Sequence, residues 1–381
     1  MQEKEITFIR HYLTPFEAKL AKLLKKKGYK INLISFYKTK EEYIDIFDKH
    51  IYLLTTKQKK ISKTRKILKL PKFFFSIRKI KKNIGIGVSE PNWFVTFIFM
   101  FFKRKFPTRV YFPYDIAYFR KKDYKKNFWH ERFSEKYNFR HCQGIIHKGP
   151  ENELNWLPEK FNASNVPNLQ FLLYCDENLM INIDDSYMKN KLSNKDGNIH
   201  LVYVGRAVHN DPGRFSDIEI FKEIVNQNLF LHLYAINYDK ISTDPEYKKL
   251  QENKFFKLHK PIYGANLQKE LSKYDWGINI FHTNFNDMKE EWAKTAYGNK
   301  ISTYLESGIP SIVNEEMKFS AEIVKNNGFG ITIKEIDELS HKIKNTDYNQ
   351  ITSMIRENRE KFTLEKNLDN LLEFIDSCKK K

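Results

Sequence analysis

The first forty residues alternate between two apolar periodicities, and this alternation is the strongest constraint on the fold. Residues 6–10 alternate like a short strand, residues 16–27 carry apolar side chains at helical spacing, and residues 30–36 (KINLISF) form a continuous apolar run. Gly28 separates the helix from the second strand, as glycine often does after a helix C-terminus. A strand, a helix and a strand in succession are typical of a βαβ unit. The sequence therefore predicts a parallel sheet covered by helices.

The alternation continues along the chain and is interrupted once. We expect further strands over 84–88, 109–113 and 143–147, with helices over 92–102 and 129–140. A proline- and asparagine-rich stretch interrupts the pattern, and a second set of strands and helices starts at 200–205 (HLVYVG). The predicted class is α/β, with two Rossmann-like doubly wound parallel-sheet domains that face a cleft. The expected division is an N-terminal domain (1–165), a linker (166–198), a C-terminal domain (199–350) and a final amphipathic helical segment (351–381).

The positive charge of the chain is confined to its first part. The whole chain has 66 Lys and Arg against 47 Asp and Glu, and residues 1–165 hold 37 and 15 of these, a net charge of +22. Residues 57–82 carry twelve basic residues and no acidic one, with Phe73, Phe74 and Phe75 in their midst. Such a run fits a solvated basic surface or an amphipathic patch on an anionic membrane. Nucleic acid is the less favoured partner, because no nucleic-acid-binding motif accompanies the run. The predicted membrane patch comprises Lys66, Lys69, Phe73, Phe74, Phe75, Arg78 and Lys79.

The composition also excludes several classes of protein. Three scattered cysteines do not form a disulfide framework or a zinc site, and the start MQEKEITFIR does not read as a signal peptide. The longest apolar run (93–102) has ten residues, whereas a membrane span needs about twenty. No G-x-G-x-x-G, Walker A, G-x-S-x-G or H-E-x-x-H sequence is present. These observations predict a cytoplasmic protein, peripheral at the inner face of the membrane.

The most informative stretch is residues 297–333, YGNKISTYLESGIPSIVNEEMKFSAEIVKNNGFGITI. Asn299 lies just before a helix that we expect to begin at Lys300. A helix N-terminus has unpaired N–H groups and a positive dipole end, which suit a diphosphate, and Lys300 adds a full charge. The alternative is an ordinary helix, turn and strand. Arg214, in the loop after the strand 200–205, is a further candidate for phosphate contact.

This stretch resembles the nucleotide-sugar-binding part of GT-B glycosyltransferases, in particular group 1-like enzymes of bacterial and archaeal surface-glycan synthesis. Those enzymes commonly show a lysine, a helix, Gly-x-Pro and a strand, as Lys300 to Val313 do here. Gly205 and Arg206 are similar to the end of their first C-domain strand. The resemblance implies an acceptor site on the first domain, a nucleoside-diphosphate-sugar site on the second, and Arg206 with Lys300 as the cations that grip the diphosphate. It also implies a glycan or lipid-linked acceptor, and a single C-terminal helix (351–381) that crosses back to the first domain.

One departure from that family concerns the donor sugar and ribose. Many members carry two glutamates eight residues apart, and the corresponding positions here are Thr295 and Thr303. Glu306 is the nearest carboxylate, and we expect either that it contacts the ribose, with Thr303 beside it, or that it is an exposed helical glutamate.

The chemistry that the resemblance implies does not call for a metal. Positive side chains and a helix dipole can neutralise a diphosphate leaving group by preorganised electrostatics. No Asp-x-Asp sequence stands in a plausible loop, so we expect neither a metal nor a cofactor besides the donor. An inverting enzyme needs a general base on the first domain. Asp115, which follows the strand 109–113, and His11, which follows the first strand, are the candidates, and Asp115 could instead cap the next helix.

The sequence therefore leaves three candidate functions. The first is a metal-independent glycosyltransferase (hexosyltransferase type) that acts on a glycan or lipid-linked acceptor. The second is a non-catalytic GT-B-like subunit that binds a nucleotide or glycan, which the missing glutamates favour. The third is a nucleotide-sugar epimerase, which the basic first domain argues against because a small free substrate needs no such surface.

Overall fold

A computed structural model of the chain describes residues 4–55, 63–89, 93–120, 129–209, 217–281 and 290–379. The chain divides into two compact units. The first consists of Met1–Leu172 with Leu368–Lys381, and the second of Leu173–Asn367. Each unit is built on one parallel sheet, as the alternation of strands and helices predicted.

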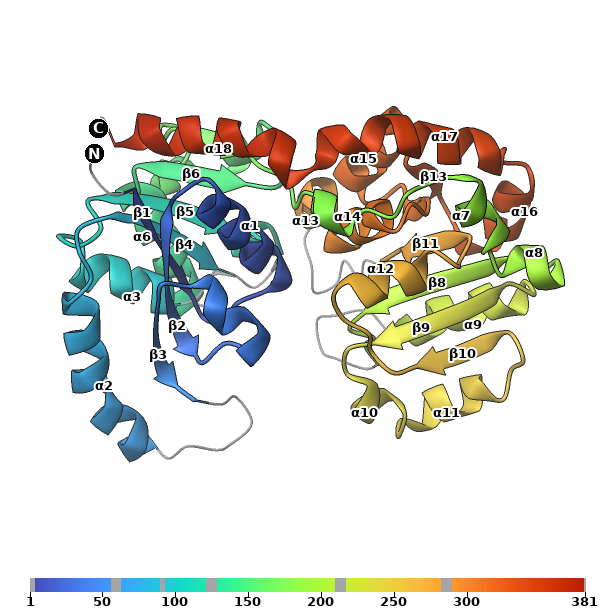
Figure 1. Ribbon diagram of the computed structural model, residues 1–381, viewed down its shortest axis with the longest axis horizontal. Helices are drawn as coiled ribbons and strands as arrows, with labels where there is room; N and C mark the ends of the chain where they lie inside the picture. The colour runs from blue at the N-terminus through green and yellow to red at the C-terminus, as the bar shows by residue number, and fades with distance from the viewer. Residues whose placement is uncertain are drawn as a thin grey trace. The chain divides into compact units, whose positions relative to one another are not determined.

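The sheet of the first unit has the strand order β3-β2-β1-β4-β5-β6-β7 (Figure 1). Its strands are β1 (Glu5–Arg10), β2 (Lys30–Tyr37), β3 (Lys49–Leu54), β4 (Ile84–Ser89), β5 (Thr108–Pro113), β6 (Gly144–His147) and β7 (Asn168–Gln170). β1 pairs in parallel with both neighbours, and Ile6 is opposite Ile31 on β2 and Ile84 on β4. The strand order reverses direction between β1 and β4, which makes the carboxyl ends of these strands the switch point where open α/β sheets bind ligands.

Helices cover both faces of this first sheet. They are α1 (Pro15–Lys26), α2 (Lys63–Arg78), α3 (Trp93–Phe101), α4 (Ala117–Arg120) and α6 (Trp129–His141). Figure 1 shows α1 on one face, with α2 and α3 on the other. The close approach of α3 to the sheet needs the glycines of β4, because a Cβ at Gly87 would lie 2.7 Å from the Phe99 ring. Thr14 and Glu17 form a capping box that starts α1.

The sheet of the second unit has the strand order β10-β9-β8-β11-β12-β13. Its strands are β8 (His200–Gly205), β9 (Phe230–Ala235), β10 (Phe256–His259), β11 (Trp276–Asn279), β12 (Ser311–Asn314) and β13 (Gly330–Ile333). The order reverses between β8 and β11, so this unit has a switch point of its own. The accompanying helices are α9 (Asp217–Asn226), α10 (Tyr238–Ile241), α11 (Pro245–Gln251), α12 (Ala265–Leu271), α13 (Glu290–Thr295), α14 (Asn299–Glu306), α15 (Lys318–Asn327), α16 (Leu339–Lys344) and α17 (Tyr348–Asn358).

Three histidines join neighbouring strands of the second sheet. His200 Nδ1 lies 3.0 Å from His232 Nε2, and His232 Nδ1 lies 2.9 Å from His259 Nε2. The Asp196 carboxylate extends this row of side-chain contacts and lies 3.1 Å from His200 Nε2. His232 is opposite Val202 on β8 and Lys257 on β10, so His200 and His259 are each two positions away from it and all three side chains lie on the same face of the sheet.

The segment expected as a linker is folded into the units instead. It forms the short helices α7 (Asp185–Lys189) and α8 (Ser193–Asp196), and Lys191 between them is 1 % exposed. The Lys191 ammonium donates to the Tyr187 hydroxyl and to the Tyr274 carbonyl, both at 2.7 Å. These contacts fix the segment to the second unit, and burial lowers the pKa of Lys191 to about 7.

The C-terminal segment also differs from the expected single helix. A 3-10 turn at Arg359–Phe362 separates α17 from α18 (Leu364–Cys378). Arg359, the first residue of this turn, is buried and donates hydrogen bonds to the Leu305 and Ile181 carbonyls. These contacts hold the turn in the second unit. From Leu368 onward, α18 belongs to the first unit. No helix within the described ranges is long and apolar enough to cross a membrane.

Candidate functional site

The candidate site lies at the switch point of the second unit. β8 ends at Gly205, β11 ends at Asn279, and α14 begins at Asn299 with Gly298 as its N-cap residue. The predicted helix start at Lys300 is therefore off by one residue, and Lys300 occupies the second position of the first turn. A cation there adds to the positive end of the helix dipole.

Lys300 is enclosed by two aromatic rings. Its Nζ atom lies 4.0 Å from the centroid of the Tyr203 ring and 4.5 Å from that of Phe281. Tyr203 lies on β8 and Phe281 lies two residues after the end of β11, so both strands of the switch point contribute to the surroundings of the lysine. The Lys300 side chain also passes along Gly205, where an added Cβ would lie 3.4 Å from Lys300 Cε. Gly205 has φ +139°, a conformation that favours glycine.

The enclosure changes the acidity of the Lys300 ammonium. Burial lowers its pKa to about 8, and the nearby Asp217 carboxylate acts in the opposite direction. Asp217 itself accepts a hydrogen bond of 2.7 Å from the Val208 N–H, which fixes the loop after β8. A cation held between rings in a poorly solvated place interacts more strongly with an anion than a solvated one does.

The position of α14 is fixed by Tyr304 beneath it. The Tyr304 hydroxyl lies 2.9 Å from the Ile278 carbonyl of β11 and 3.3 Å from the Val202 carbonyl of β8. Gly277 leaves room for the ring, because a Cβ there would overlap it. The helix that carries Lys300 is thus joined to both strands of the switch point.

The other residues predicted for the diphosphate and sugar have different surroundings. Arg206 follows Gly205 and is exposed, and Asn299 is exposed at the first position of α14. Thr303 is half-buried, and its hydroxyl donates to the Asn299 carbonyl at 3.3 Å. The structure therefore brings Gly205, Arg206, Asn299 and Lys300 to the ends of neighbouring elements. Arg214 lies outside the described residues.

The surroundings of Glu306 differ from both predictions made for it, a ribose contact and an exposed position on the helix. It is fully buried, and its carboxylate accepts a hydrogen bond of 2.9 Å from the Asp176 N–H and one of 2.7 Å from Gln268 Nε2. Neither a ribose contact nor an exposed helical position agrees with this burial. Glu306 lies at the end of α14 opposite to Lys300, on the inner side of the helix, and its partners make it a structural residue.

Asn279 is a residue that the sequence analysis missed. It is fully buried at the end of β11, and neither atom of its amide has a hydrogen-bond partner among the residues that the structure describes. A Cβ at Gly298 would lie 2.9 Å from Asn279 Oδ1, so the amide packs directly on the N-cap of α14. Tyr203, Phe281 and Asp217 were missed too. No local sequence motif indicates which aromatic or acidic residues a distant lysine will contact.

The two candidate bases lie at the carboxyl ends of strands of the first unit. Asp115 follows β5 and forms an ion pair with Lys148 at 3.2 Å. The Ala117 and Tyr118 N–H groups at the start of α4 donate to the buried Glu135 carboxylate. His11 follows β1, and its ring stacks on Phe36 at 4.6 Å between centroids.

The predicted membrane patch is only partly exposed. Phe73 is buried against Phe94, and Phe74 is half-buried, stacked on Phe97 at 5.5 Å. Phe75 is exposed, as are Lys69, Arg78 and Lys79, and Lys79 Nζ lies 4.5 Å from the Phe75 ring centroid. Successive residues of a helix point about 100° apart, so three consecutive phenylalanines cannot all face water. The side chain of Lys66 lies outside the described residues.

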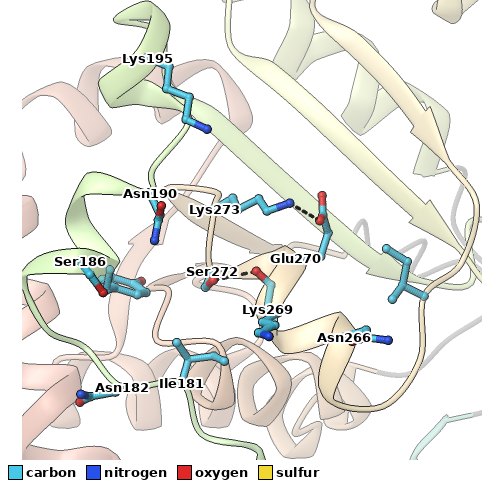
Figure 2. A pocket seen from close by; sticks show the side chains of 12 residues that line it. Ile181, Asn182, Ser186, Asn190, Lys195, Asn266, Lys269, Glu270, Ser272 and Lys273 are labelled. Carbon is cyan, nitrogen blue, oxygen red and sulfur yellow. Dashed lines mark hydrogen bonds and ion pairs between the residues drawn. The ribbon is translucent and has the colours of Figure 1, made fainter.

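A separate cavity of 610 Å³ opens beside α12 in the second unit (Figure 2). Lys273 pairs with Glu270 at 2.6 Å on its wall, as the dashed line in Figure 2 shows. The residues that line it include none of those predicted for the donor. They are Ile181, Asn182, Ser186, Tyr187, Asn190, Lys195, Ile262, Asn266, Lys269, Glu270, Ser272 and Lys273.

Most of the second unit is similar to a known protein family. Residues 212–366 match the model of the glucosyltransferase 3-like C-terminal domain. The chain is 28 % identical over 99 residues to glucosyltransferase 3 of Streptococcus parasanguinis, an alignment that covers 26 % of this chain and 29 % of that protein. The chain thus matches less than a third of the length of this relative.

Solved structures with the same architecture cover nearly the whole chain. HepE of Anabaena, in complex with UDP, has a TM-score of 0.68 at 14 % identity and covers 98 % of this chain and 100 % of its own. The pneumococcal O-GlcNAc transferase GtfA, in complex with UDP and GlcNAc, has a TM-score of 0.62 at 9 % identity and covers 99 % of each chain. These likenesses show that the chain has the GT-B fold, and they confirm the resemblance to GT-B glycosyltransferases that the sequence predicted.

Proposed function

We propose that this chain, which has the GT-B fold and a glucosyltransferase 3-like C-terminal domain, is a glycosyltransferase that takes a sugar from a UDP-sugar. The observation that carries this proposal is the Lys300 ammonium, held between Tyr203 and Phe281 at the first turn of α14. UDP accompanies both HepE and GtfA in their solved structures, which supports uridine as the nucleoside.

The chemistry follows from the charge of the leaving group. Transfer breaks the bond between the anomeric carbon and a diphosphate oxygen, and UDP leaves with increased negative charge. Lys300 and the unpaired N–H groups at the start of α14 stabilise that charge, and they need no reorganisation because rings and strands already hold them. Arg206 is exposed beside Gly205, within the same turn of chain, and we propose it as the second cation. We also propose that the transfer does not need a metal ion.

The acceptor side of the proposal rests on the first unit. We propose Asp115 or His11 as the base that takes the proton of the acceptor hydroxyl, if the reaction inverts the anomeric carbon. The acceptor is proposed to be a glycan or a lipid-linked glycan in surface-polysaccharide or glycoconjugate synthesis. The excess of basic residues in 1–165 supports a peripheral position at an anionic membrane, on its cytoplasmic side.

The direct test is release of UDP from candidate UDP-sugars, with and without acceptor. We expect wild-type turnover and a loss of about 10²–10³-fold in kcat/KM for Lys300→Ala, the size found when one preorganised donor to a developing anion is removed. Lys294→Ala is the matched control, because Lys294 is a half-exposed lysine on the preceding helix α13. Equal activity of Lys300→Ala and wild type would remove the proposed diphosphate role.

One observation favours a second candidate function. The two family glutamate positions carry Thr295 and Thr303, and Glu306 is engaged by Asp176 and Gln268. A non-catalytic subunit that binds a nucleotide sugar would have such a site. Calorimetric binding of UDP that depends on Lys300, with no turnover of any UDP-sugar across an acceptor panel, would favour this second candidate.

A further inference from the structure

The helices α2, α3 and α6 of the first unit lie side by side and expose aromatic rings. Phe74 of α2 stacks on Phe97 of α3, and α3 packs against α6. The exposed fractions of the outward side chains are high for aromatic residues: Phe75 60 %, Trp93 45 %, Phe101 67 %, Trp129 71 % and Phe133 50 %. Together with the partly exposed Phe97, these residues form what we call the aromatic face.

α6 exposes two aromatic side chains, although it buries Phe139 together with several polar residues. Trp129 and Phe133, four residues apart on one side, are exposed, whereas Ser134, Glu135 and Asn138 are buried. The buried Asn138 amide donates to the Thr96 hydroxyl at 3.0 Å, so polar groups join α6 to α3. A surface helix normally turns its apolar stripe inward. The two large rings that α6 leaves outside are therefore candidates for contact with an apolar phase or partner.

α3 leads to the same conclusion from a different pattern. Its sequence, WFVTFIFMF, is apolar on every side except at the buried Thr96, although helices of that kind are normally buried. The rings of Trp93, Phe97 and Phe101 form a column, with centroids 6.0 Å and 4.5 Å apart. Contiguous exposed apolar surface of this kind marks an interaction site rather than scattered surface residues.

The charge near the aromatic face indicates which kind of partner binds to it. The sequences of α2 and α3 contain no acidic residue, and α6 carries Glu131 as well as the buried Glu135. Basic side chains outnumber the acidic ones on these helices and in the turn after α3. The exposed basic ones are Lys69, Lys72, Arg78, Lys79, Lys103, Arg104 and Arg140. A second copy of the chain would bring like charges together, so self-association through this face is disfavoured. Single-stranded nucleic acid needs free ring faces for stacking, whereas the α3 rings are packed against one another.

We propose that the aromatic face is the membrane-contact surface of this protein, and that Trp93, Phe101, Trp129 and Phe133 enter the interfacial region of an anionic bilayer. Tryptophan and other aromatic side chains favour that region, and the surrounding lysines and arginines meet the lipid phosphates. The inference rests on the peripheral membrane position proposed above and deepens it. It moves the contact away from Phe73, which is buried, and from the half-buried Phe74, to α3 and α6.

The test is co-sedimentation of the full chain with vesicles of phosphatidylcholine alone and with one quarter phosphatidylglycerol. We expect binding to the anionic vesicles, and a loss of at least tenfold in partition coefficient for the double variant Phe101→Ser/Trp129→Ser at 150 mM salt, because two apolar side chains no longer leave water. Trp156→Ser is the matched control, since Trp156 is 40 % exposed in the same unit but outside these helices. Unchanged far-UV circular dichroism and thermal midpoint establish that the variants fold.

Two further measurements separate the alternatives. Brominated lipid should quench the tryptophan fluorescence of the wild type, and Trp129→Phe should reduce that quenching. Equal binding of Phe101→Ser/Trp129→Ser and wild type, or binding that a single-stranded oligonucleotide displaces completely, would overturn the inference. Turnover of a UDP-sugar with a water-soluble acceptor is unchanged in the double variant if only membrane contact is lost. Absence of turnover in the wild type, with vesicle binding intact, would contradict the proposed transferase and leave this inference standing.

Discussion

Lys300 Nζ lies 4.0 Å from the centroid of the Tyr203 ring, although 97 residues separate the two in the chain. The contact joins the first turn of α14 to the last residues of β8, and it places a partly desolvated cation at the switch point of the second sheet.

The first prediction concerns the charge and shape at position 300. Lys300→Met keeps an unbranched side chain between the Tyr203 and Phe281 rings but removes the ammonium. We expect the calorimetric affinity for UDP to fall by about 10–100-fold, because a charge-assisted contact to a phosphate is lost. Lys294→Met should bind UDP like the wild type. UDP binding that is unaffected by Lys300→Met would contradict the site.

The pH dependence of UDP binding follows from the pKa of Lys300, which burial lowers to about 8. The lysine is charged below that value, so UDP affinity should be highest near pH 7 and fall by up to about tenfold per pH unit above pH 8. The UDP phosphates are already ionised in this range. Calorimetry at pH 7, 8 and 9 tests this, and Lys300→Arg should show a flat profile because arginine does not titrate there. A falling profile in that variant would assign the titration to another group.

Glu306→Gln tests the correction to the predicted ribose contact. The amide would turn its N–H groups toward the Asp176 N–H or the Gln268 amide, which both donate to the carboxylate. We expect the free energy of unfolding to fall by about 1–3 kcal/mol, the cost of leaving buried polar groups unsatisfied. The dissociation constant of UDP should stay the same. Thr303→Ala, one turn away, should change stability by less than about 0.5 kcal/mol. A stable Glu306→Gln variant with weakened UDP binding would restore the ribose role.

The histidine chain of the second sheet should make the protein sensitive to acid. Burial, with the neighbouring His259 and His200, lowers the pKa of His232 to about 3, whereas an unfolded histidine has a pKa of about 6.5. Between these values the unfolded chain binds the extra proton. Stability is therefore fully present above pH 6.5 and declines by about 1.4 kcal/mol per pH unit below it.

Urea denaturation at pH 7, 6 and 5 measures this slope. His232→Gln should start from a lower stability, because the contacts to His200 and His259 are changed, but should show a smaller decline with pH. His341→Gln is the matched control, since His341 is exposed on α16 of the same unit. Identical slopes for His232→Gln and wild type would show that other groups cause the acid sensitivity.

Asp115→Asn tests the acceptor side. If Asp115 takes the proton of the acceptor hydroxyl, kcat should fall by about 10²–10⁴-fold, while UDP affinity, which depends on the second unit, should not change. Steady-state kinetics with saturating acceptor, together with UDP calorimetry, separates these effects. His11→Gln, at the end of β1, is the competing variant. A large loss in His11→Gln and none in Asp115→Asn would reassign the base.

The architecture could be predicted from the sequence because it depends on local periodicity. Apolar runs of strand length, separated by helical patterns, give both parallel sheets, and Gly28 and Pro310 stand where a helix has ended. The strands β3, β7 and β10 were missed, because they lie at sheet edges and carry polar residues such as Lys49, Asn168 and Lys257. An edge strand is only partly covered, so its sequence lacks the continuous apolar run of a central strand.

The sequence by itself determined the fold class, the concentration of positive charge in the first 165 residues, and the lysine at the start of α14. Only the tertiary structure decided which side chains surround that lysine, that Glu306 is enclosed by Asp176 and Gln268, and that Phe73 is buried while Phe101 and Trp129 are exposed. Periodicity is a property of neighbouring residues and can be read from the chain. The surroundings of a side chain depend on the rotation of its helix and on partners from distant strands, and packing alone sets both.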